Sequence, residues 1–548
     1  MSLFLPKNQK VVQQSRYSNP IVFGKNPTEN IVSVENIAKT QKFRIYTEKN
    51  GKVSYFEQDS VFWLITHELL SDSQYELAGD QFYKYIAYFN TQAERDKICR
   101  QLKTQGHDFY RCFDQKEQSL IFNGFTYYKG LTPTSVRILS TDIETNTLKY
   151  DPDRSKILII ANTFRANGKI IRRKFCLDDY KGNELAMIKD WCAWVREMDP
   201  SIIVGHNILP FDLPYLDSKM FNLRGKLALG RDGSPIVFDK WTTKKRKDAT
   251  QNIEFYNSHI FGREIIDTMF LSINYDFKRE FPSYGLKPII KHLGLEKQGR
   301  TFVDASKIGE YYERYMSTGD CPEWLLSKQY AEEDSDDALK LYDKMVTPYF
   351  LLGQSVGKSF QQMINSATGS QVNNMMIRAY LQQGHSIAKA SLREKFQGAI
   401  SFGIAGIYHN CLKVDVSSLY PSIMRQYEIF CKEKDPQKIF LQMVEYFTVE
   451  RLKNKKLYEE TKEQYYSDLS EAFKIAINSM YGFLGASGLN YNYPEGAALV
   501  TAKGREVLAI ATQYATGKSI DYWIDLSNTD GHEEVEDEGF NQEPILEG

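Results

Sequence analysis

The pattern of apolar and polar residues predicts strands in the N-terminal half of the chain. Phe43 to Thr47 and Val53 to Phe56 flank Lys49-Asn-Gly-Lys52, and Asn-Gly between two such runs is a typical hairpin turn. Ser135 to Ser140 and Ile202 to Gly205 are hydrophobic runs of the length expected for buried strands. We therefore expect β-sheets before the helical part of the chain begins.

The pattern becomes mainly helical from about residue 350. Residues 440 to 482 are predicted to form a helical hairpin rich in Lys and Glu. Leu412 to Val416 alternates as a buried strand would, and residues 417 to 422 then turn into a helix. A chain of 548 residues is long enough for three or four domains, so the predicted fold class is multidomain α/β.

Composition limits the function classes without selecting one. Hydrophobic residues make up 42% and charged residues 25%, and a net charge of −1 leaves nucleic-acid binding open because a DNA channel needs only a local basic lining. No apolar run reaches membrane-spanning length, and Met1 to Lys7 is too short and mixed for a signal peptide, so we expect a soluble cytoplasmic protein. The seven scattered cysteines are expected to be reduced thiols.

Four carboxylates and a phenol form the first candidate site. Asp142 and Glu144 follow the strand at 135–140, and alternation places both on one side. Asp212 lies near a helix start, and Tyr330 and Asp334 lie one helical turn apart. These carboxylates could hold two Mg²⁺ or Mn²⁺ ions, with Tyr330 orienting an attacking water. The pattern therefore predicts in-line hydrolysis of a phosphodiester.

Two features near this site leave alternatives open. Asp336 and Asp337 lie close enough to Asp334 for a shift of register, and a solvated acidic helix face is an alternative for Asp334. Lys244-Lys-Arg-Lys247 is expected to be a solvated loop or hairpin that contacts DNA phosphates, with a nuclear signal as the less favoured interpretation.

A second candidate site centres on Lys413-Val-Asp-Val-Ser-Ser-Leu-Tyr-Pro-Ser422. The expected strand carries Asp415 to its carboxyl end, where a carboxylate for Mg²⁺ precedes backbone N–H groups that attract phosphate. On the expected helix that follows, Lys474, Asn478 and Tyr481 share one face. Nucleotidyl transfer from a triphosphate requires groups of these kinds.

These stretches resemble motifs A and B of the family B DNA polymerases. The segments holding Asp142, Asp212 and Asp334 resemble, in order and spacing, the three motifs of a DnaQ-like, RNase H-fold 3′→5′ proofreading exonuclease. Phe396-Gln-Gly-Ala399 resembles the element that holds the template strand, with Phe where Tyr is usual, and a Gly turn between helix and strand is an alternative for it. Ser283-Tyr-Gly-Leu-Lys287 resembles a connecting segment of the nuclease that is structural or contacts the DNA strand. The resemblance implies an exonuclease domain, a partial right-hand palm and helical fingers.

The resemblance also implies a division of the chain into domains. The expected parts are an N-terminal domain, the exonuclease domain, the first part of the palm, the fingers, the second part of the palm and a disordered acidic tail, at residues 1–134, 135–350, 351–435, 436–485, 486–530 and 531–548.

Site roles follow from the same resemblance. The implied catalytic residues are Asp142, Glu144, Asp212, Tyr330, Asp334 and Asp415, and the metal ligands are these five carboxylates with Val416. The implied nucleotide-binding residues are Ser418, Leu419, Tyr420, Arg451, Lys455, Lys474, Asn478 and Tyr481. The implied DNA-binding residues are Asn207, Phe396, Gly398 and Gly482. Tyr420 is expected to exclude a 2′-hydroxyl and so to favour dNTPs, and ordinary pairing with Glu459 is an alternative for Arg451 and Lys455.

The resemblance does not extend to the second palm carboxylate, which the family carries in an Asp-Thr-Asp hairpin called motif C. The one candidate is Asp530 in Ser527-Asn-Thr-Asp-Gly531, with Tyr522 to Leu526 as an incoming strand. Positions 530 to 548 hold eight acidic residues and no Lys or Arg, so they cannot form an apolar outgoing strand. We expect Asp530 to lie in a loop, with motif C and the thumb supplied by a second polypeptide.

The leading hypothesis is a replicative DNA-directed DNA polymerase subunit with proofreading, from a phage, virus or other replicon in a bacterial or archaeal host cell. It implies primer–template DNA and dNTPs as partners and leaves a sliding clamp open. The alternatives are a metal-dependent 3′→5′ DNA exonuclease whose palm and fingers only bind DNA, and a DNA-binding scaffold without activity. The complete carboxylate set at 142, 144, 212 and 334 argues against the scaffold.

Overall fold

The computed structural model describes residues 16–37, 39–112, 114–247, 252–392, 396–416 and 418–529. Its central sheet has the strand order β10-β9-β8-β11-β14. The strands are β8 (Ile138–Thr145), β9 (Ile157–Ala166), β10 (Lys169–Cys176), β11 (Ile202–Gly205) and β14 (Glu264–Asp267). The pairs β8–β9 and β9–β10 are antiparallel, whereas β11 is parallel to both β8 and β14. This mixed sheet confirms the expected α/β class and the RNase H-like fold.

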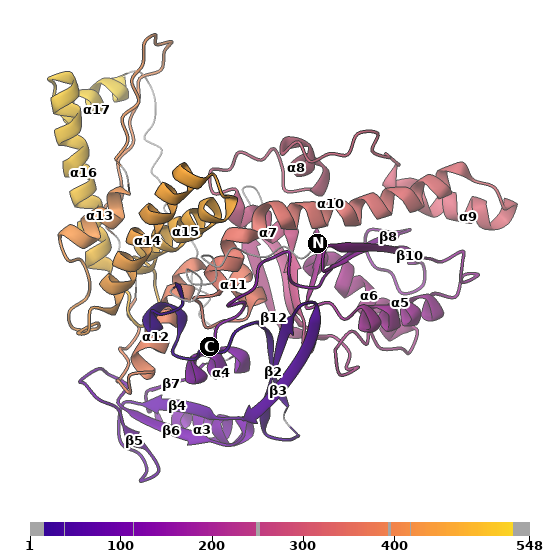
Figure 1. Cartoon of the computed structure of the whole chain (residues 1–548), viewed down its shortest axis with the longest axis horizontal. Helices are drawn as coiled ribbons and strands as arrows, with labels where there is room; N and C mark the ends of the chain where they lie inside the picture. The colour runs from indigo at the N-terminus through magenta and orange to yellow at the C-terminus, as the bar shows by residue number, and fades with distance from the viewer. Residues whose placement is uncertain are drawn as a thin grey trace.

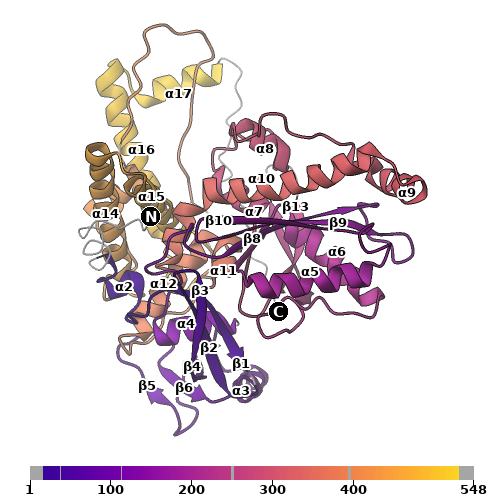
Figure 2. The ribbon, with the colours of Figure 1, turned by 45° about the vertical axis from the view of Figure 1, so that its right-hand side comes forward.

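Both faces of the central sheet are covered by helices. Alternation sends Ile138 and Ile202 into one hydrophobic cluster, with residues of α10 (Pro322–Gly353), and sends Leu139 and Ile203 into another, with residues of α5 (Glu184–Met198). Figure 2 shows α10 and α5 on opposite sides of the strands. Because β9 and β11 are buried on both sides, hydrophobic residues follow one another in their sequences, whereas the first five residues of the edge strand β10 are exposed.

Shorter elements connect the strands of this sheet. A π-helix (Ile208–Asp212) and α6 (Leu213–Asn222) follow β11, and the antiparallel hairpin of β12 (Val237–Lys247) and β13 (Asn252–His259) precedes β14. The predicted basic stretch 244–247 therefore lies at the end of a hairpin strand. Before α10 come α7 (Thr268–Tyr275), α8 (Leu286–His292), a 3₁₀ turn (Ala305–Lys307) and α9 (Ile308–Thr318).

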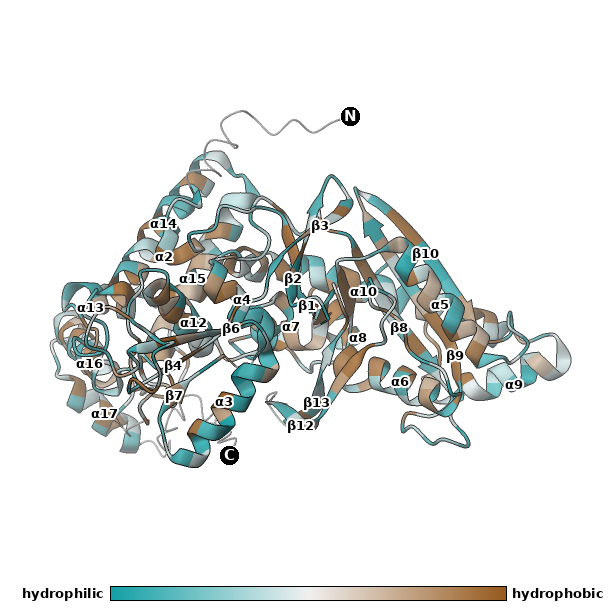
Figure 3. Ribbon diagram, turned by 90° about the horizontal axis from the view of Figure 1, so that it is seen from below, coloured by the Kyte–Doolittle hydropathy of each residue, from teal (hydrophilic) through white to brown (hydrophobic). Residues whose placement is uncertain are grey.

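The N-terminal part contains two further sheets. One has the order β1-β2-β3, from β1 (Ile31–Ile37), β2 (Lys42–Lys49) and β3 (Lys52–Asp59), and it confirms the predicted hairpin. The other has the order β5-β6-β4-β7, from β4 (Phe62–Thr66), β5 (Tyr75–Glu76), β6 (Tyr85–Phe89) and β7 (Phe109–Tyr110). Helices α2 (Pro20–Phe23), α3 (Gln92–Gln105) and α4 (Gln115–Asn123) accompany them, and α3 is largely hydrophilic (Figure 3).

The remaining regular elements of the described chain are helices. Helices α11 (Phe360–Asn365) and α12 (Thr368–Leu381) lead to α13 (Leu419–Gln426), and α14 (Ile439–Thr461) and α15 (Gln464–Leu484) form the predicted helical hairpin. After it come α16 (Pro494–Thr516) and α17 (Ile520–Thr529). Figure 1 shows α13 to α17 gathered at one end of the molecule, away from α5, α6 and α9.

Two strand predictions are wrong. Leu412 to Val416 is irregular and exposed, with side chains of Leu412 88% and Val414 76% accessible, because no strand among the described residues pairs with it. Tyr522 to Leu526, the alternative incoming strand for Asp530, lies inside α17. Asp530 and the acidic tail lie outside the described residues. None of the helices described is both long and apolar enough to be a membrane span.

Candidate active sites

Three of the predicted carboxylates meet at one point beside the central sheet. Asp142 and Glu144 belong to β8, which runs on through the predicted strand end to Thr145, so its pleat puts both on one side. Asp334 reaches them from α10, and one oxygen of each of the three lies within 4.8 Å of the others. Two distant segments, 142–144 and 334, therefore form one cluster of hard oxygen donors.

The fourth carboxylate, Asp212, ends the π-helix and is 3% exposed. Its Oδ1 accepts a hydrogen bond of 3.2 Å from the backbone N–H of Ile143, which lies between Asp142 and Glu144 in β8. A Cβ on Gly205, at the end of β11, would lie 2.8 Å from the carbonyl oxygen of Thr141. Glycine therefore permits the close approach of backbone that brings Asp212 beside β8.

Burial and mutual repulsion act on all four carboxyl groups. Burial, followed by the charges of Asp334 and Glu144, raises the pKa of Asp142 well above its usual value. Burial and Asp334 raise the pKa of Glu144 to about 8. Burial raises the pKa of Asp334 against the opposing charges of Lys287 and Arg300, and burial and Asp142 raise that of Asp212. Closely packed carboxylates whose ionised forms are disfavoured in this way fit a site for divalent cations, which would offset the repulsion.

The hydrogen bonds and ion pairs of Asp336 and Asp337 decide which carboxylate of this part of α10 joins the cluster. Asp336 accepts from Arg172 Nε at 2.9 Å and from Thr163 Oγ1 at 2.7 Å, so it faces β9 and β10. Asp337 pairs with Arg300 at 3.0 Å and Lys340 at 2.7 Å. The structure thus brings Asp334 to the cluster, rather than either of the two alternatives.

Tyr330 lies one turn before Asp334 and is 3% exposed. The Nζ of Lys287 lies 4.1 Å from the centroid of its ring and 3.5 Å from Oδ2 of Asp334. Arg300 also donates to Asp334. The predicted site residues did not include either cation: Lys287 ends a segment expected to be structural or to contact the DNA strand, and Arg300 belongs to no motif that the sequence analysis identified.

Asn207 begins the π-helix in the left-handed conformation, with φ 66°. Its backbone N–H donates to Asp267 at 2.9 Å, and the N–H of Leu209 donates to the same carboxylate at 3.1 Å. Burial raises the pKa of Asp267 to about 6. Asp267 is a further residue that the sequence did not identify, and it fixes the backbone on which Asn207 and Asp212 lie.

The predicted polymerase residues are less closely assembled. Asp415 and Val416 lie in the exposed segment before α13, and none of the acidic groups described joins Asp415 in a cluster of three. Ser418 precedes α13 with φ 54° and accepts from Arg451 of α14. Leu419 starts α13, and the ring of Tyr420 lies 4.5 Å from that of Tyr481 of α15.

The expected cations of the fingers point in different directions. Lys474 pairs with Glu471 of its own helix at 3.0 Å and lies 5.4 Å from the ring of Phe277 in the segment between α7 and α8. Lys455 and Asn478 are exposed. The structure therefore joins Arg451 to the motif A turn but does not bring Lys474 to it.

Of the other predicted DNA-binding positions, Phe396 and Gly398 lie near the end of α15 and α16, and Gly482 lies within α15. A Cβ on Gly485 would lie 3.3 Å from the ring of Phe396, and the carbonyl oxygen of Gly398 accepts from Arg505 of α16. Gly482 is exposed and faces open space.

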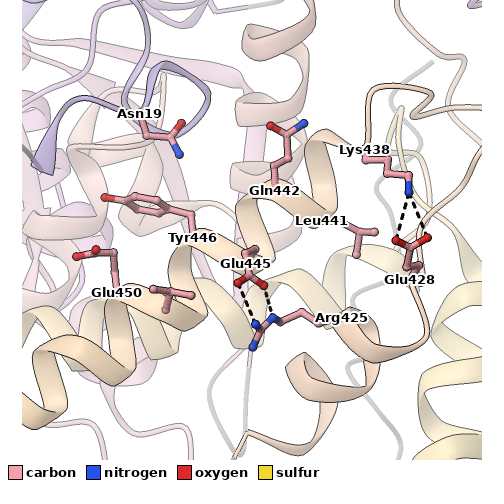
Figure 4. A pocket seen from close by; sticks show the side chains of 10 residues that line it. Asn19, Arg425, Glu428, Lys438, Leu441, Gln442, Glu445, Tyr446 and Glu450 are labelled. Atoms are coloured by element: carbon pink, nitrogen blue, oxygen red, sulfur yellow. Dashed lines mark hydrogen bonds and ion pairs between the residues drawn. The ribbon is translucent and has the colours of Figure 1, made fainter.

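A cavity of about 570 Å³ lies between α13 and α14, apart from the carboxylate cluster. Figure 4 shows two ion pairs within the lining, Arg425 with Glu445 and Lys438 with Glu428 at 3.1 Å, and the fifth charged residue, Glu450, pairs with Lys453 outside it at 3.2 Å. Because these charges are already matched, the cavity presents no set of unpaired ligands to a substrate.

Comparison with known proteins identifies the relatives of this chain. Residues 113–289 match the model of the DNA polymerase family B exonuclease domain, and residues 427–541 match the DNA polymerase family B model. A DNA polymerase of Pyrococcus glycovorans is 25% identical over 425 residues, which is 69% of this chain and 52% of that protein. The DNA polymerase delta catalytic subunit of Caenorhabditis elegans is 26% identical over 441 residues, which is 70% of this chain and 39% of that protein.

The fold is also shared with a solved structure. The family B DNA polymerase from the hyperthermophilic archaeon Pyrobaculum calidifontis superposes with a TM-score of 0.69 at 18% identity, over 88% of this chain and 71% of that chain. The chain spans about half or less of the two relatives above. With two family models matched in the expected order, and with the mixed sheet and helical hairpin that accompany them, this chain belongs to the family B DNA polymerases.

Proposed function

We propose that this chain hydrolyses DNA from the 3′ end as the proofreading part of a replicative family B DNA polymerase. The cluster of Asp142, Glu144 and Asp334 is the observation that carries this proposal. Burial and repulsion disfavour the metal-free arrangement of these groups, whereas two divalent cations would be held by them and by Asp212.

We assign a separate role in hydrolysis to each of these residues. Bound Mg²⁺ or Mn²⁺ would stabilise the charge that develops on the entering and leaving oxygens. Asp142, Glu144, Asp212 and Asp334 hold the ions, and Tyr330 orients the attacking water. Asn207, on the segment fixed by Asp267, contacts the DNA strand. Arg300 holds Asp334 in the direction of the cluster.

For DNA synthesis, we propose that primer–template DNA and dNTPs bind across α13, α14 and α15. Tyr420 and Tyr481 would line the sugar site, with Ser418, Leu419, Arg451, Lys455, Lys474 and Asn478 on the nucleotide. Phe396, Gly398 and Gly482 would lie along the DNA strand. Asp415 and the carbonyl group of Val416 would bind metal once a neighbouring strand orders residues 412–416.

A neighbouring strand for residues 412–416 and the second palm carboxylate are proposed to come from a second polypeptide. The exposure of Leu412 and Val414 supports this proposal, because alternating apolar residues at these positions are suited to a sheet. The proposed function keeps the domain limits expected from the sequence: 1–134, 135–350, 351–435, 436–485 and 486–530.

The seven cysteines are all free thiols, as expected in a reducing compartment. We therefore propose the cytoplasm as the site of this activity. We also propose, from the sequence resemblance alone, a bacterial or archaeal host cell, the replication of a phage or virus, and a sliding clamp as a further partner.

The test is a gel assay on a labelled primer–template with Mg²⁺, with and without dNTPs, using the wild-type chain, Asp142→Ala and Asp415→Ala. We expect degradation that Asp142→Ala abolishes and Asp415→Ala leaves intact. Extension that Asp415→Ala abolishes would show that the chain alone forms the palm site, and would refute the need for a second polypeptide. A wild-type chain that leaves the primer intact would refute the exonuclease.

A second candidate is an exonuclease whose palm and fingers only bind DNA, which the exposed position of Asp415 favours. The two candidates separate when the proposed second polypeptide is added: extension supports the polymerase, and unchanged degradation supports the nuclease alone.

A further inference from the structure

We propose that Lys287 is a further catalytic residue of the nuclease, whose ammonium group contacts the phosphodiester that is cleaved. The proposal rests on the exonuclease function proposed above. Lys287 lies in the first turn of α8, and its Nζ lies 3.5 Å from Oδ2 of Asp334 and 4.1 Å from the ring centroid of Tyr330. It thus stands between a ligand of the carboxylate cluster and the phenol proposed to orient water.

Two cationic side chains contact Asp334, and they differ in solvent exposure. The side chain of Arg300 is 1% exposed and lies between Asp334 and Asp337. The side chain of Lys287 is 38% exposed and has Asp334 as its ion-pair partner. Because Arg300 already holds Asp334 from the buried side, Lys287 is not needed as an anchor and lies on the side that DNA can reach.

The charge of Lys287 acts on the whole cluster. Its ammonium group lies 3.5 Å from Oδ2 of Asp334, whose carboxylate lies within 4.8 Å of those of Asp142 and Glu144. When the three carboxylates hold divalent cations, their attraction for Lys287 weakens. The phosphodiester then becomes the anion within reach of a flexible, partly exposed ammonium group.

The reaction creates the charge that this group would stabilise. A water oxygen forms a bond to phosphorus, the bond from phosphorus to the 3′-oxygen breaks, and the electron pair leaves with that oxygen. One proton of the water ends on the 3′-hydroxyl group of the shortened strand, and the other is released as the nucleoside monophosphate ionises. Lys287 stays protonated and donates to a non-bridging oxygen as its negative charge grows.

The test pairs Lys287→Met with Lys291→Met. Lys291 is exposed one turn later on the same helix, so both changes remove one positive charge from α8. We expect Lys287→Met to lower the single-turnover rate of 3′-end hydrolysis about 100-fold, and Lys291→Met to change it less than about twofold. Lys287→Arg, which keeps the charge, should recover most of the rate.

A binding cycle separates contact with phosphate from a purely structural role. Wild type and Lys287→Met are titrated, with Ca²⁺ in place of Mg²⁺, with a single strand whose last linkage is either a phosphodiester or a neutral methylphosphonate. We expect the neutral linkage to weaken binding by wild type about tenfold more than binding by Lys287→Met.

Equal sensitivity of the two proteins to the neutral linkage would overturn the proposal, as would a Lys287→Met rate equal to that of Lys291→Met. If Lys287→Met does not fold, as judged by its melting temperature, the same cycle is carried out with Lys287→Gln and then decides the question. Failure of the exonuclease function has a different signature, because wild type would then show no degradation that Asp142→Ala removes.

Discussion

The nuclease site and the palm site rely on the same chemical group in opposite surroundings. Asp142 lies in β8, which is paired with β9 and β11 and covered by helices on both faces. Asp415 lies in an exposed segment without a neighbouring strand among the described residues. Carboxylates can be held in a fixed arrangement only where their backbone is fixed, and only the backbone around Asp142 is fixed by neighbouring strands in this way.

The largest difference should appear when single carboxylates are removed from α10. Asp334→Ala should lower the nuclease rate by about 10³-fold or more, because it removes a ligand from the cluster. Asp336→Ala, two residues later, should leave the rate within about threefold, since Asp336 faces Arg172 and Thr163. A loss of equal size in single-turnover assays of Asp336→Ala would place the site in the other register.

Replacing valine by alanine in β11 and in residues 412–416 compares how much each segment contributes to the free energy of unfolding. Val204→Ala in β11 should cost about 1–3 kcal/mol of unfolding free energy, because Val204 is fully buried. Val414→Ala should cost less than about 0.5 kcal/mol, because Val414 is 76% exposed. Denaturant unfolding checks both values, and a cost above about 1 kcal/mol for Val414→Ala would contradict the exposed position of the segment.

We expect Asp142→Asn to stabilise the metal-free protein in EDTA, by less than Val204→Ala destabilises it. Burial and the charges of Asp334 and Glu144 disfavour ionised Asp142, so the neutral amide should stabilise the metal-free protein by about 1 kcal/mol. Asp415→Asn is the control and should have no effect. Thermal unfolding in EDTA and in Mg²⁺ measures both, and a lower melting temperature of Asp142→Asn in EDTA would contradict the repulsion.

The sequence predicted the cluster of carboxylates better than the residues that surround it. Asp142 and Glu144 could be placed on one side of a strand, and Asp334 one turn from Tyr330, because strand and helix periodicity fix such relations locally. Lys287, Arg300 and Asp267 were missed because they meet the site through tertiary contacts that leave no local pattern.

Residues 412–416 show that a strand-like sequence pattern does not by itself produce a strand. Leu412, Val414 and Val416 alternate with polar residues as in a strand, yet these three side chains are exposed. Alternation identifies a segment that can join a sheet, but the strand forms only when a neighbour provides hydrogen bonds. The helical hairpin of α14 and α15 was predicted correctly, since its two helices pack on each other and need no neighbouring strand.

The most direct test of the difference between the sites is a count of bound Mn²⁺ by titration of the wild-type chain, Asp142→Ala and Asp415→Ala. We expect Asp142→Ala to lose tightly bound ions and Asp415→Ala to bind as many as wild type with the same affinity. Loss of an ion in Asp415→Ala would contradict the account, because it would mean that the palm site is already assembled in this chain.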